Sequence, residues 1–143
     1  MRVKQISLFL ENKTGRLVRV TEALSNQGIN IRALSIADTT DFGILRLIVS
    51  NPNEAFKILK DAGFTVSSTD VIAVEVPDSP GGLHRTLTIL EDKGINIEYL
   101  YAFLEKAQDK ALVVFRVEEV DRAVELLKEA GINSINEEDI YNI

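Results

Sequence analysis

An internal duplication constrains the fold of this chain more than any other feature of its sequence. Gly-Ile-Asn-Ile occurs at Gly28–Ile31 and again at Gly94–Ile97. Each copy lies 13 residues after a glycine, Gly15 or Gly81, so the period is 66 residues (81 − 15 and 94 − 28). A 143-residue chain with a period near half its length is a duplicated domain, because two copies are too few for a solenoid.

The repeat predicts two domains, residues 1–69 and 70–143. Only Thr69 and Asp70 separate the predicted units, so they cannot move far apart. Each unit has roughly 70 residues, a size at which a lone hydrophobic core is marginal. We therefore expect the two halves to share an interface.

The first copy alternates strand and helix patterns. Apolar residues spaced two apart predict strands, and a spacing of three to four predicts helices, each of which ends at a glycine. The predicted strands cover residues 3–10, 29–37, 44–50 and 64–68, and the predicted helices cover 17–27 and 53–62.

The second copy predicts strands at 71–76, 95–104 and 111–117, a weakly patterned strand after Ile132, and helices at 83–93 and 120–130. The order β-α-β-β-α-β is that of the ferredoxin-like unit. We therefore predict an α+β protein of two ferredoxin-like βαββαβ units packed as a pseudo-twofold pair. One joined sheet of eight strands, with the four long helices on one side, would hide edges that otherwise invite aggregation. Turns are predicted at 38–43 and 104–110.

Composition excludes several classes of function. The formal charge is 16 − 22 = −6 and Trp is absent, so we expect neither nucleic acid nor an anionic membrane as a partner. The absence of Cys removes disulfides and thiolate chemistry, and one histidine, His84, cannot form a metal site alone. We expect no metal, no cofactor, no membrane span and no secretory signal, and hence a cytoplasmic protein.

Both copies resemble the ACT domain, a small amino-acid-sensing module of biosynthetic enzymes. The first copy carries Leu8-Phe9-Leu10-Glu11-Asn12-Lys13-Thr14-Gly15-Arg16-Leu17 before its Gly-Ile-Asn-Ile segment. The second carries Val74-Glu75-Val76-Pro77-Asp78-Ser79-Pro80-Gly81-Gly82-Leu83 and keeps a Pro-Gly pair where the first has Thr14-Gly15. The resemblance covers essentially the whole chain as two ACT domains with no catalytic domain.

The resemblance implies that an amino acid binds between the first strand–helix loop of one domain and the neighbouring domain. In the family, a loop Asn and the Asn of the Gly-hydrophobic-Asn-hydrophobic segment hold the ligand. These positions are Asn12 and Asn30 in the first copy and Asp78 and Asn96 in the second. The full set of candidate ligand-binding residues is Leu10, Asn12, Lys13, Thr14, Gly15, Arg16, Leu17, Asn30, Ile31, Val76, Asp78, Ser79, Gly81, Gly82, Leu83, Asn96 and Ile97.

The physical chemistry of these residues agrees with that site. A loop glycine lets backbone N–H groups approach a carboxylate, and a helix N-terminus adds about half a positive charge. An Asn side chain both donates and accepts, so it can bind either end of an amino acid.

Structural interpretations of the same residues stay open. The glycines also supply permissive backbone angles, and Asn30 and Asn96 can fasten a turn. Asp78 and Ser79 can serve as helix caps, and His84 can be a solvated residue in the first turn of its helix.

Charge predicts that the two loops bind unequally. Residues 11–16 carry two cations and one carboxylate, a net of 2 − 1 = +1, whereas residues 77–83 carry only the charge of Asp78, −1. Asp78 repels a ligand carboxylate and can only accept hydrogen bonds from the ammonium. We expect the first loop to hold a ligand carboxylate better.

These observations predict a non-catalytic amino-acid-binding regulator. The alternative is an accessory subunit that regulates a separate enzyme of amino-acid metabolism. The small subunit of acetolactate synthase is similar to residues 6–36 of this chain but has a different C-terminal half. An enzyme is not expected, because no spacing of residues suggests a nucleophile–base pair. The expected partner is an amino acid, with a homodimer or a partner enzyme left open.

Overall fold

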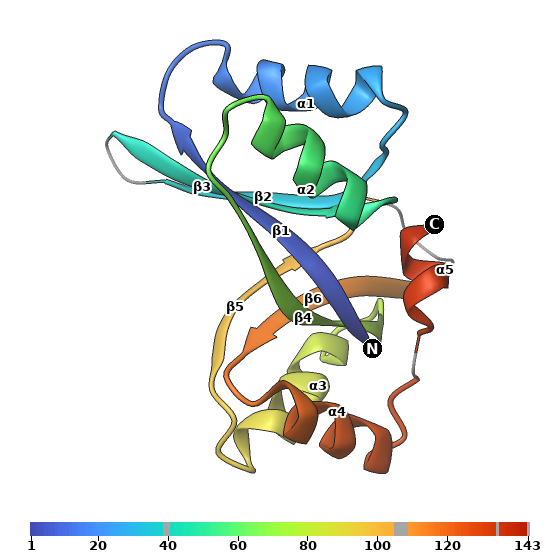
Figure 1. The fold of residues 1–143 in the computed structure, drawn as a ribbon. Helices are drawn as coiled ribbons and strands as arrows, with labels where there is room; N and C mark the ends of the chain where they lie inside the picture. The colour runs from blue at the N-terminus through green and yellow to red at the C-terminus, as the bar shows by residue number, and fades with distance from the viewer. Residues whose placement is uncertain (39–40, 105–108, 134, 143) are drawn as a thin grey trace. The chain divides into compact units, whose positions relative to one another are not determined.

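The computed structural model describes residues 1–38, 41–104, 109–133 and 135–142. They form two compact units, of which the first is Lys4–Thr69 and the second combines Met1–Val3 with Asp70–Ile143. Strands and helices follow the order of two ferredoxin-like βαββαβ units, so the predicted α+β class is confirmed (Figure 1). The first three residues, which the repeat alone assigns to the first half, belong to the second unit.

The first unit has its strands in the order β2-β3-β1-β4. The central strand β3 pairs antiparallel with β1 on one side and with β2 on the other. Helices α1 and α2 lie on the same face of these strands (Figure 1). The elements are β1 (Arg2–Glu11), α1 (Arg16–Asn26), β2 (Ile31–Asp38), β3 (Phe42–Val49), α2 (Pro52–Asp61) and the start of β4 (Val66–Pro77).

The core of the first unit follows from the spacing of apolar residues, which is two in the strands and three to four in the helices. Alternate residues of β1 point toward the helices, as the burial of Leu8 and Leu10 shows. Val20 and Leu24, four apart on α1, meet them and are fully buried. After α1, Gly28 takes a positive φ of 70°, which lets the chain leave the helix and enter β2.

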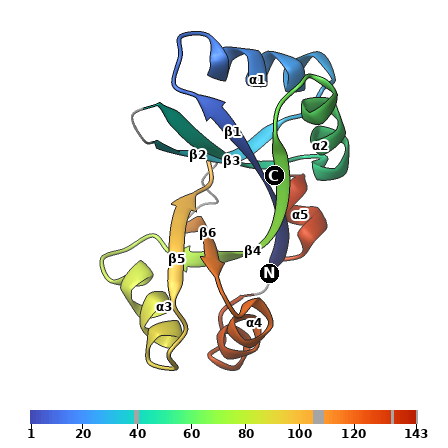
Figure 2. The same cartoon turned by 60° about the vertical axis from the view of Figure 1, so that its left-hand side comes forward.

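The second unit has its strands in the order β1-β4-β6-β5 (Figure 2). Strand β6 pairs antiparallel with both β4 and β5. Phe115, on β6, is fully buried within the core. The further elements are α3 (Gly82–Glu91), β5 (Ile97–Ala102), β6 (Lys110–Val117), α4 (Val120–Glu129) and α5 (Glu137–Tyr141).

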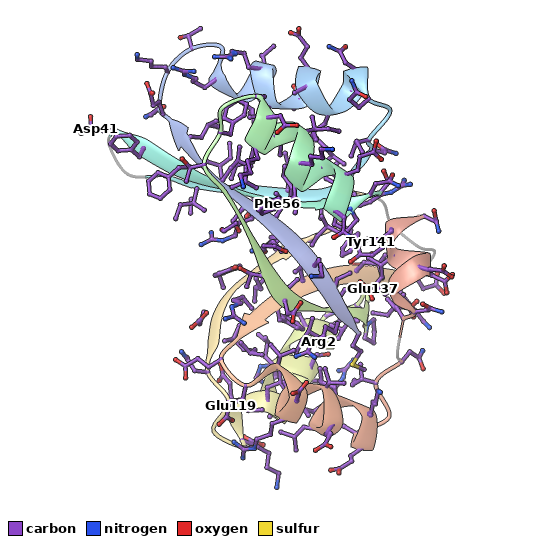
Figure 3. The ribbon with its side chains drawn as sticks, viewed as in Figure 1. Arg2, Asp41, Phe56, Glu119, Glu137 and Tyr141 are labelled. Carbon is purple, nitrogen blue, oxygen red and sulfur yellow. The ribbon has the colours of Figure 1, made fainter. Side chains whose placement is uncertain are left out.

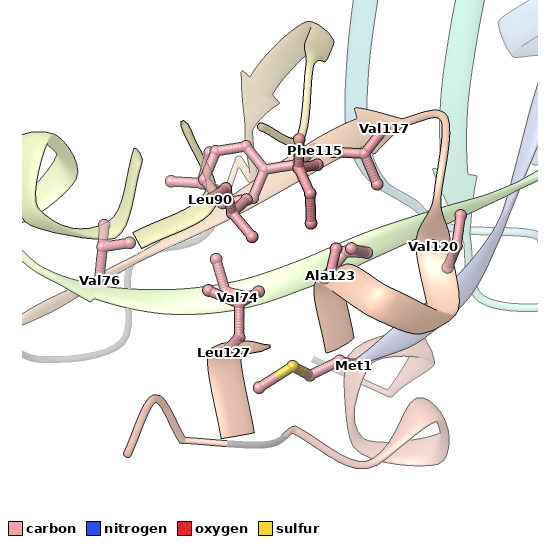
Figure 4. Packing of buried hydrophobic residues seen from close by; sticks show 12 residues of the cluster. Met1, Val74, Val76, Leu90, Phe115, Val117, Val120, Ala123 and Leu127 are labelled. Atoms are coloured by element: carbon pink, nitrogen blue, oxygen red, sulfur yellow. The ribbon is translucent and has the colours of Figure 1, made fainter. Parts of the chain in front are cut away.

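Met1–Val3 take the fourth-strand position of the second unit. The Met1 carbonyl accepts a hydrogen bond of 2.8 Å from the amide of Ala73 on β4. The Met1 side chain lies in the same core cluster as Leu127 (Figure 4), and Val3 is fully buried. Arg2, which Figure 3 labels, lies on the outward face. Its guanidinium pairs with a carboxylate oxygen of Asp121 at 3.0 Å.

The expectation of eight strands is wrong, because the described residues form six. The strands predicted at 64–68 and 71–76 are one continuous strand, β4. Residues 66–71, Val-Ser-Ser-Thr-Asp-Val, contain no Gly or Pro that would turn the chain. Thr69 and Asp70 therefore continue the strand and do not form a linker.

The strand predicted after Ile132 is absent from the residues described there. Helix α5 follows instead, and the side chain of its N-cap, Asn136, accepts a hydrogen bond of 3.0 Å from the amide of Glu138. Met1–Val3 occupy the sheet position that this strand would have filled. The predicted turns at 38–43 and 104–110 include residues 39, 40 and 105–108, which lie outside the described residues. The pseudo-twofold packing of the halves stays a prediction.

We expect Val3→Ala to lower the free energy of unfolding by about 2 kcal/mol, because it removes buried methyl groups and leaves a cavity. Urea denaturation followed by circular dichroism measures this loss. The matched control is Lys4→Ala on the exposed face of the same strand, which should change stability by less than about 0.5 kcal/mol. Equal effects of the two substitutions would contradict the packing of Val3.

Candidate functional site

Both strand–helix loops end at a glycine in the left-handed region. Gly15 has a φ of 90° and Gly81 a φ of 86°, and each is the N-cap of the helix that follows. Neither glycine N-cap provides a side-chain cap, and the capping role of Asp78 and Ser79 stays a prediction. The first amide of each helix donates to a loop carbonyl, that of Arg16 to Lys13 at 3.3 Å and that of Gly82 to Ser79 at 3.0 Å. The first turn of each helix carries the positive end of the helix dipole.

Ion pairs organise the charges of the first loop. A carboxylate oxygen of Glu11 lies 3.2 Å from the Lys13 ammonium, and the other lies 3.4 Å from the Arg16 guanidinium. The hydrogen bond from Lys13, and next the charge of Arg16, hold the pKa of Glu11 below its ordinary value. The loop is fixed to the start of β3 because the Asn12 amide donates to the carbonyl of Asp41, a residue that Figure 3 labels.

A cavity of about 450 Å³ lies in the first unit, beside the end of β1. Segments from β1, α1, β3 and the α2–β4 connection meet around it. Two of the predicted residues, Leu10 and Arg16, line it. The full lining is Phe9, Leu10, Glu11, Arg16, Arg19, Phe42, Ala62, Gly63, Phe64 and Thr65.

The sequence analysis missed the aromatic and cationic residues of this cavity. The rings of Phe9 and Phe42 meet edge to face with centroids 6.0 Å apart. The Arg19 guanidinium carbon lies 5.8 Å from the centroid of the Phe64 ring, a cation–π distance. One signal was present, since Arg19 recurs as Arg85 at the repeat spacing (85 − 19 = 66).

The second loop is built differently at the equivalent positions. Gly82 stands where the first copy has Arg16, and a Cβ added to Gly82 would lie 2.0 Å from the Pro77 carbonyl oxygen. Glu75 replaces Phe9 (75 − 9 = 66) and pairs with the Lys110 ammonium at 3.0 Å. Only glycine fits such a close approach of the helix to the strand, so this loop cannot present the side chain that the first loop presents.

The loop and the Gly-Ile-Asn-Ile segment of one unit lie at opposite ends of its sheet. In the first unit Leu10 pairs with Gly43, whereas Ile31 pairs with Val49, six positions along β3 (49 − 43 = 6). Six residues of strand span about 20 Å. Within one unit, therefore, Asn12 and Asn30 do not reach one ligand.

The second unit has the same geometry. Val76 pairs with Ala111 and Ile97 with Val117, again six positions apart (117 − 111 = 6). Asp78 and Asn96 are separated in the same way.

The remaining predicted residues lie in three kinds of place. Those of the first loop are exposed, those at the start of each first helix are about one-third exposed, and those on strands pack with the cores. The exposed set is Asn12, Lys13, Thr14 and Gly15; Leu17 and Leu83 begin the helices; and Ile31, Val76 and Ile97 belong to the strands.

The backbone of Asn30 joins two strands, whereas the turn interpretation of its side chain stays a prediction. The Asn30 amide donates to the Ser50 hydroxyl at 3.0 Å, and the Asn30 carbonyl accepts from the Ser50 amide at 2.9 Å. These bonds fasten the start of β2 to the end of β3 without using the Asn30 side chain.

Two absences hold for the residues that the structure describes. They contain no group of three His, Asp or Glu side chains that could hold a metal ion. None of their helices is long and apolar enough to cross a membrane.

Two ferredoxin-like units in tandem, each with a glycine-bounded strand–helix loop, define the class of architecture to which this chain belongs. Comparison with family models matches the whole chain, residues 1–143, to the ACT domain pair. The chain belongs to this family. No match was found among curated proteins.

Several solved structures share this fold. The chain is 45% identical to protein BT0572 from Bacteroides thetaiotaomicron, with a TM-score of 0.94 over 100% of this chain and 98% of that one. The ligand-free regulatory subunit of aspartate kinase from Thermus thermophilus is 18% identical, with a TM-score of 0.65 over 89% and 91%. A structure of aspartokinase alpha and beta subunits is 14% identical, with a TM-score of 0.61 over 91% and 92%. The last two likenesses concern the fold alone.

We expect Gly82→Ala to lower the free energy of unfolding by about 3 kcal/mol, because the added methyl group overlaps the Pro77 carbonyl. The matched control is Arg16→Ala at the same repeat position. It removes only an exposed ion pair and should cost less than about 1 kcal/mol. Chemical denaturation of both variants measures the difference, and a tolerated Gly82→Ala would contradict the close approach.

We expect Lys13→Ala to raise the pKa of Glu11 toward its ordinary value of 4.5, and to raise it more than Arg16→Ala does. The lowered pKa makes a stabilising contribution that is present above that ordinary value and is lost as the pH falls through the folded value. An NMR pH titration of the Glu11 carboxyl carbon measures the shift. A pKa that neither substitution changes would mean that the pairs do not form in solution.

Proposed function

We propose that the protein is a non-catalytic regulator that binds an amino acid at the strand–helix loops of its ACT units. The observation that carries this proposal is that the ACT domain pair accounts for residues 1–143 in full. Every segment of the 143-residue sequence therefore belongs to a module of this kind. The proposal retains the expected ligand position near the domain–domain interface and the ligand contacts Asn12, Asn30, Asp78 and Asn96, but the two members of a pair in one unit do not contact the same ligand.

The chemistry of the first loop supports this function. The N-terminus of α1 follows a left-handed glycine, and its Arg16 amide donates to the Lys13 carbonyl, so the amides of Leu17 and Val18 are the ones that can donate to a carboxylate. Arg16 and Arg19, on the first turn of this helix, add two guanidinium groups beside the cavity. A carboxylate next to such groups gains charge-assisted hydrogen bonds.

The absence of catalysis is part of the proposal. His84, the only histidine, is exposed at the start of α3. Its backbone carbonyl accepts a hydrogen bond of 2.8 Å from the Thr88 hydroxyl. Neither observation gives the imidazole a role as a general base, and the solvated interpretation of this residue accounts for it.

An accessory subunit of a separate enzyme is the second candidate function. The observation that favours it is the fold shared with regulatory subunits of aspartate kinase. Affinity purification of the full chain from its native cells separates the candidates. Stoichiometric recovery of a larger enzyme, whose activity responds to an amino acid only when this chain is present, would favour the accessory subunit.

We expect at least one of the twenty amino acids to stabilise the protein. A ligand at about 100 times its dissociation constant adds roughly 2.7 kcal/mol to the free energy of unfolding, which a thermal-shift assay detects readily. Matched sodium salts of simple carboxylates serve as the control for ionic strength. If no amino acid raises the melting temperature at millimolar concentration, the proposed function is wrong.

A further inference from the structure

The cavity of the first unit combines opposite charges with aromatic rings. Arg16 and Arg19 contribute two positive charges and Glu11 contributes one negative charge, a net of 2 − 1 = +1. The whole chain carries −6, so this cationic surface runs against the overall charge. An anionic group is therefore favoured here, and one carboxylate remains beside it to accept from a cation.

Arg19 is the cation best placed to bind a ligand. Within the described part of the chain, its guanidinium contacts the Phe64 ring and forms no ion pair with a carboxylate. Arg16, by contrast, is already shared with Glu11 at 3.4 Å. The planar fork of a guanidinium can bind a carboxylate through two parallel hydrogen bonds while its face stays on the ring.

Three phenyl rings give the cavity its apolar part. Phe9 is 56% exposed and Phe42 is 49% exposed, although each is large and apolar. Phe64 completes the set from the α2–β4 connection, and its ring is held under Arg19. Exposed aromatic rings that meet around a concave space mark a binding site more often than a solvated surface.

We propose that this cavity selects an α-amino acid with an aromatic side chain. The ligand carboxylate binds the guanidinium of Arg19, with that of Arg16 beside it, and the ligand ammonium binds the carboxylate of Glu11. The ligand ring packs on the three phenyl rings. This inference rests on the proposed function and adds to it the class of amino acid and residues outside the loop positions that the family resemblance supplied.

The volume of the cavity and the arrangement of its aromatic rings agree with an aromatic amino acid as ligand. Its volume of about 450 Å³ lies in the range of ordinary small-molecule sites. Aromatic rings prefer edge-to-face contacts, and Phe9 and Phe42 already meet in that geometry. Small polar amino acids would leave these rings in contact with water, so they gain less from the site.

The second unit does not repeat these features. At the repeat spacing from Phe9 and Arg16 it has Glu75 and Gly82, and the Glu75 carboxylate is paired with Lys110. Of Phe9, Arg16 and Arg19, only Arg19 has the same residue type at the repeat spacing, as Arg85. The proposed selectivity therefore belongs to the first unit, and Arg85 becomes a natural control.

The first experiment is calorimetric titration of the full chain with L-phenylalanine. We expect one binding event per chain and at least a tenfold loss of affinity in Arg19→Gln, because a charged hydrogen bond is removed. The matched substitution Arg85→Gln should leave the affinity within about twofold. An equal loss in the two variants, or binding unchanged in Arg19→Gln, would overturn the assignment of Arg19.

The second experiment tests the role of Glu11. L-Phenylalanine is compared with 3-phenylpropionate, which keeps the carboxylate and the ring but lacks the ammonium. We expect Glu11→Gln to weaken phenylalanine about tenfold and to leave 3-phenylpropionate equal or tighter. If both ligands weaken equally, Glu11 does not bind the ammonium.

The third experiment separates the aromatic class from the general function. Phe42→Ala should weaken L-phenylalanine at least threefold, while Leu100→Ala, on a residue 41% exposed in the second unit, should not. If glycine, serine or aspartate binds to the wild-type protein and phenylalanine does not, the aromatic class is wrong and the regulator remains. If none of the twenty amino acids binds, both proposals fail.

Discussion

Pairing between β1 and β4 is the constraint on which both units depend. In the first unit the Phe9 amide donates to the Thr65 carbonyl at 3.2 Å, and in the second the Ala73 amide donates to the Met1 carbonyl at 2.8 Å. Each strand contributes residues to both units, so six strands fill the positions that two separate ferredoxin-like units would fill with eight. The core of the second unit is complete only when the first residues of the chain join it.

The duplication and the local periodicities were sufficient to predict the class of fold. The glycines that stop helices and the alternation in β1 act through neighbouring residues, and these can be read from the sequence. At the join between the repeats, two strands and a short linker were predicted, whereas Val66–Pro77 is one continuous strand, because no Gly or Pro interrupts residues 66–71. The use of Met1–Val3 as a strand was missed because that pairing joins residues about 70 positions apart, beyond the reach of any local pattern.

The candidate site shows the same limit. The charged loop at residues 11–16 was predicted from its composition, and Leu10 and Arg16 do line the cavity. Phe9, Phe42 and Phe64 come from three segments that only the folded chain brings together. Phe9 in particular lies on the face of β1 opposite the helices, so a search for core residues passes over it.

The two halves have the same backbone at their strand–helix loops but different side chains there. Gly15 and Gly81 adopt nearly the same backbone angles, so both loops lead into a helix in the same way. The next residue differs, because Arg16 adds a cation to the first loop whereas Gly82 brings the second helix against Pro77. A shared fold does not imply a shared function, and here the side chains argue for a single selective site in the first unit.

A structure of the full chain with L-phenylalanine tests this account most directly. The account predicts ligand density in the cavity of the first unit, with the carboxylate within hydrogen-bonding distance of the Arg19 guanidinium and the ammonium facing Glu11. Density at the loop of residues 77–82 alone, or a ligand that contacts Asn30 or Asn96 and leaves Arg19 untouched, would contradict it.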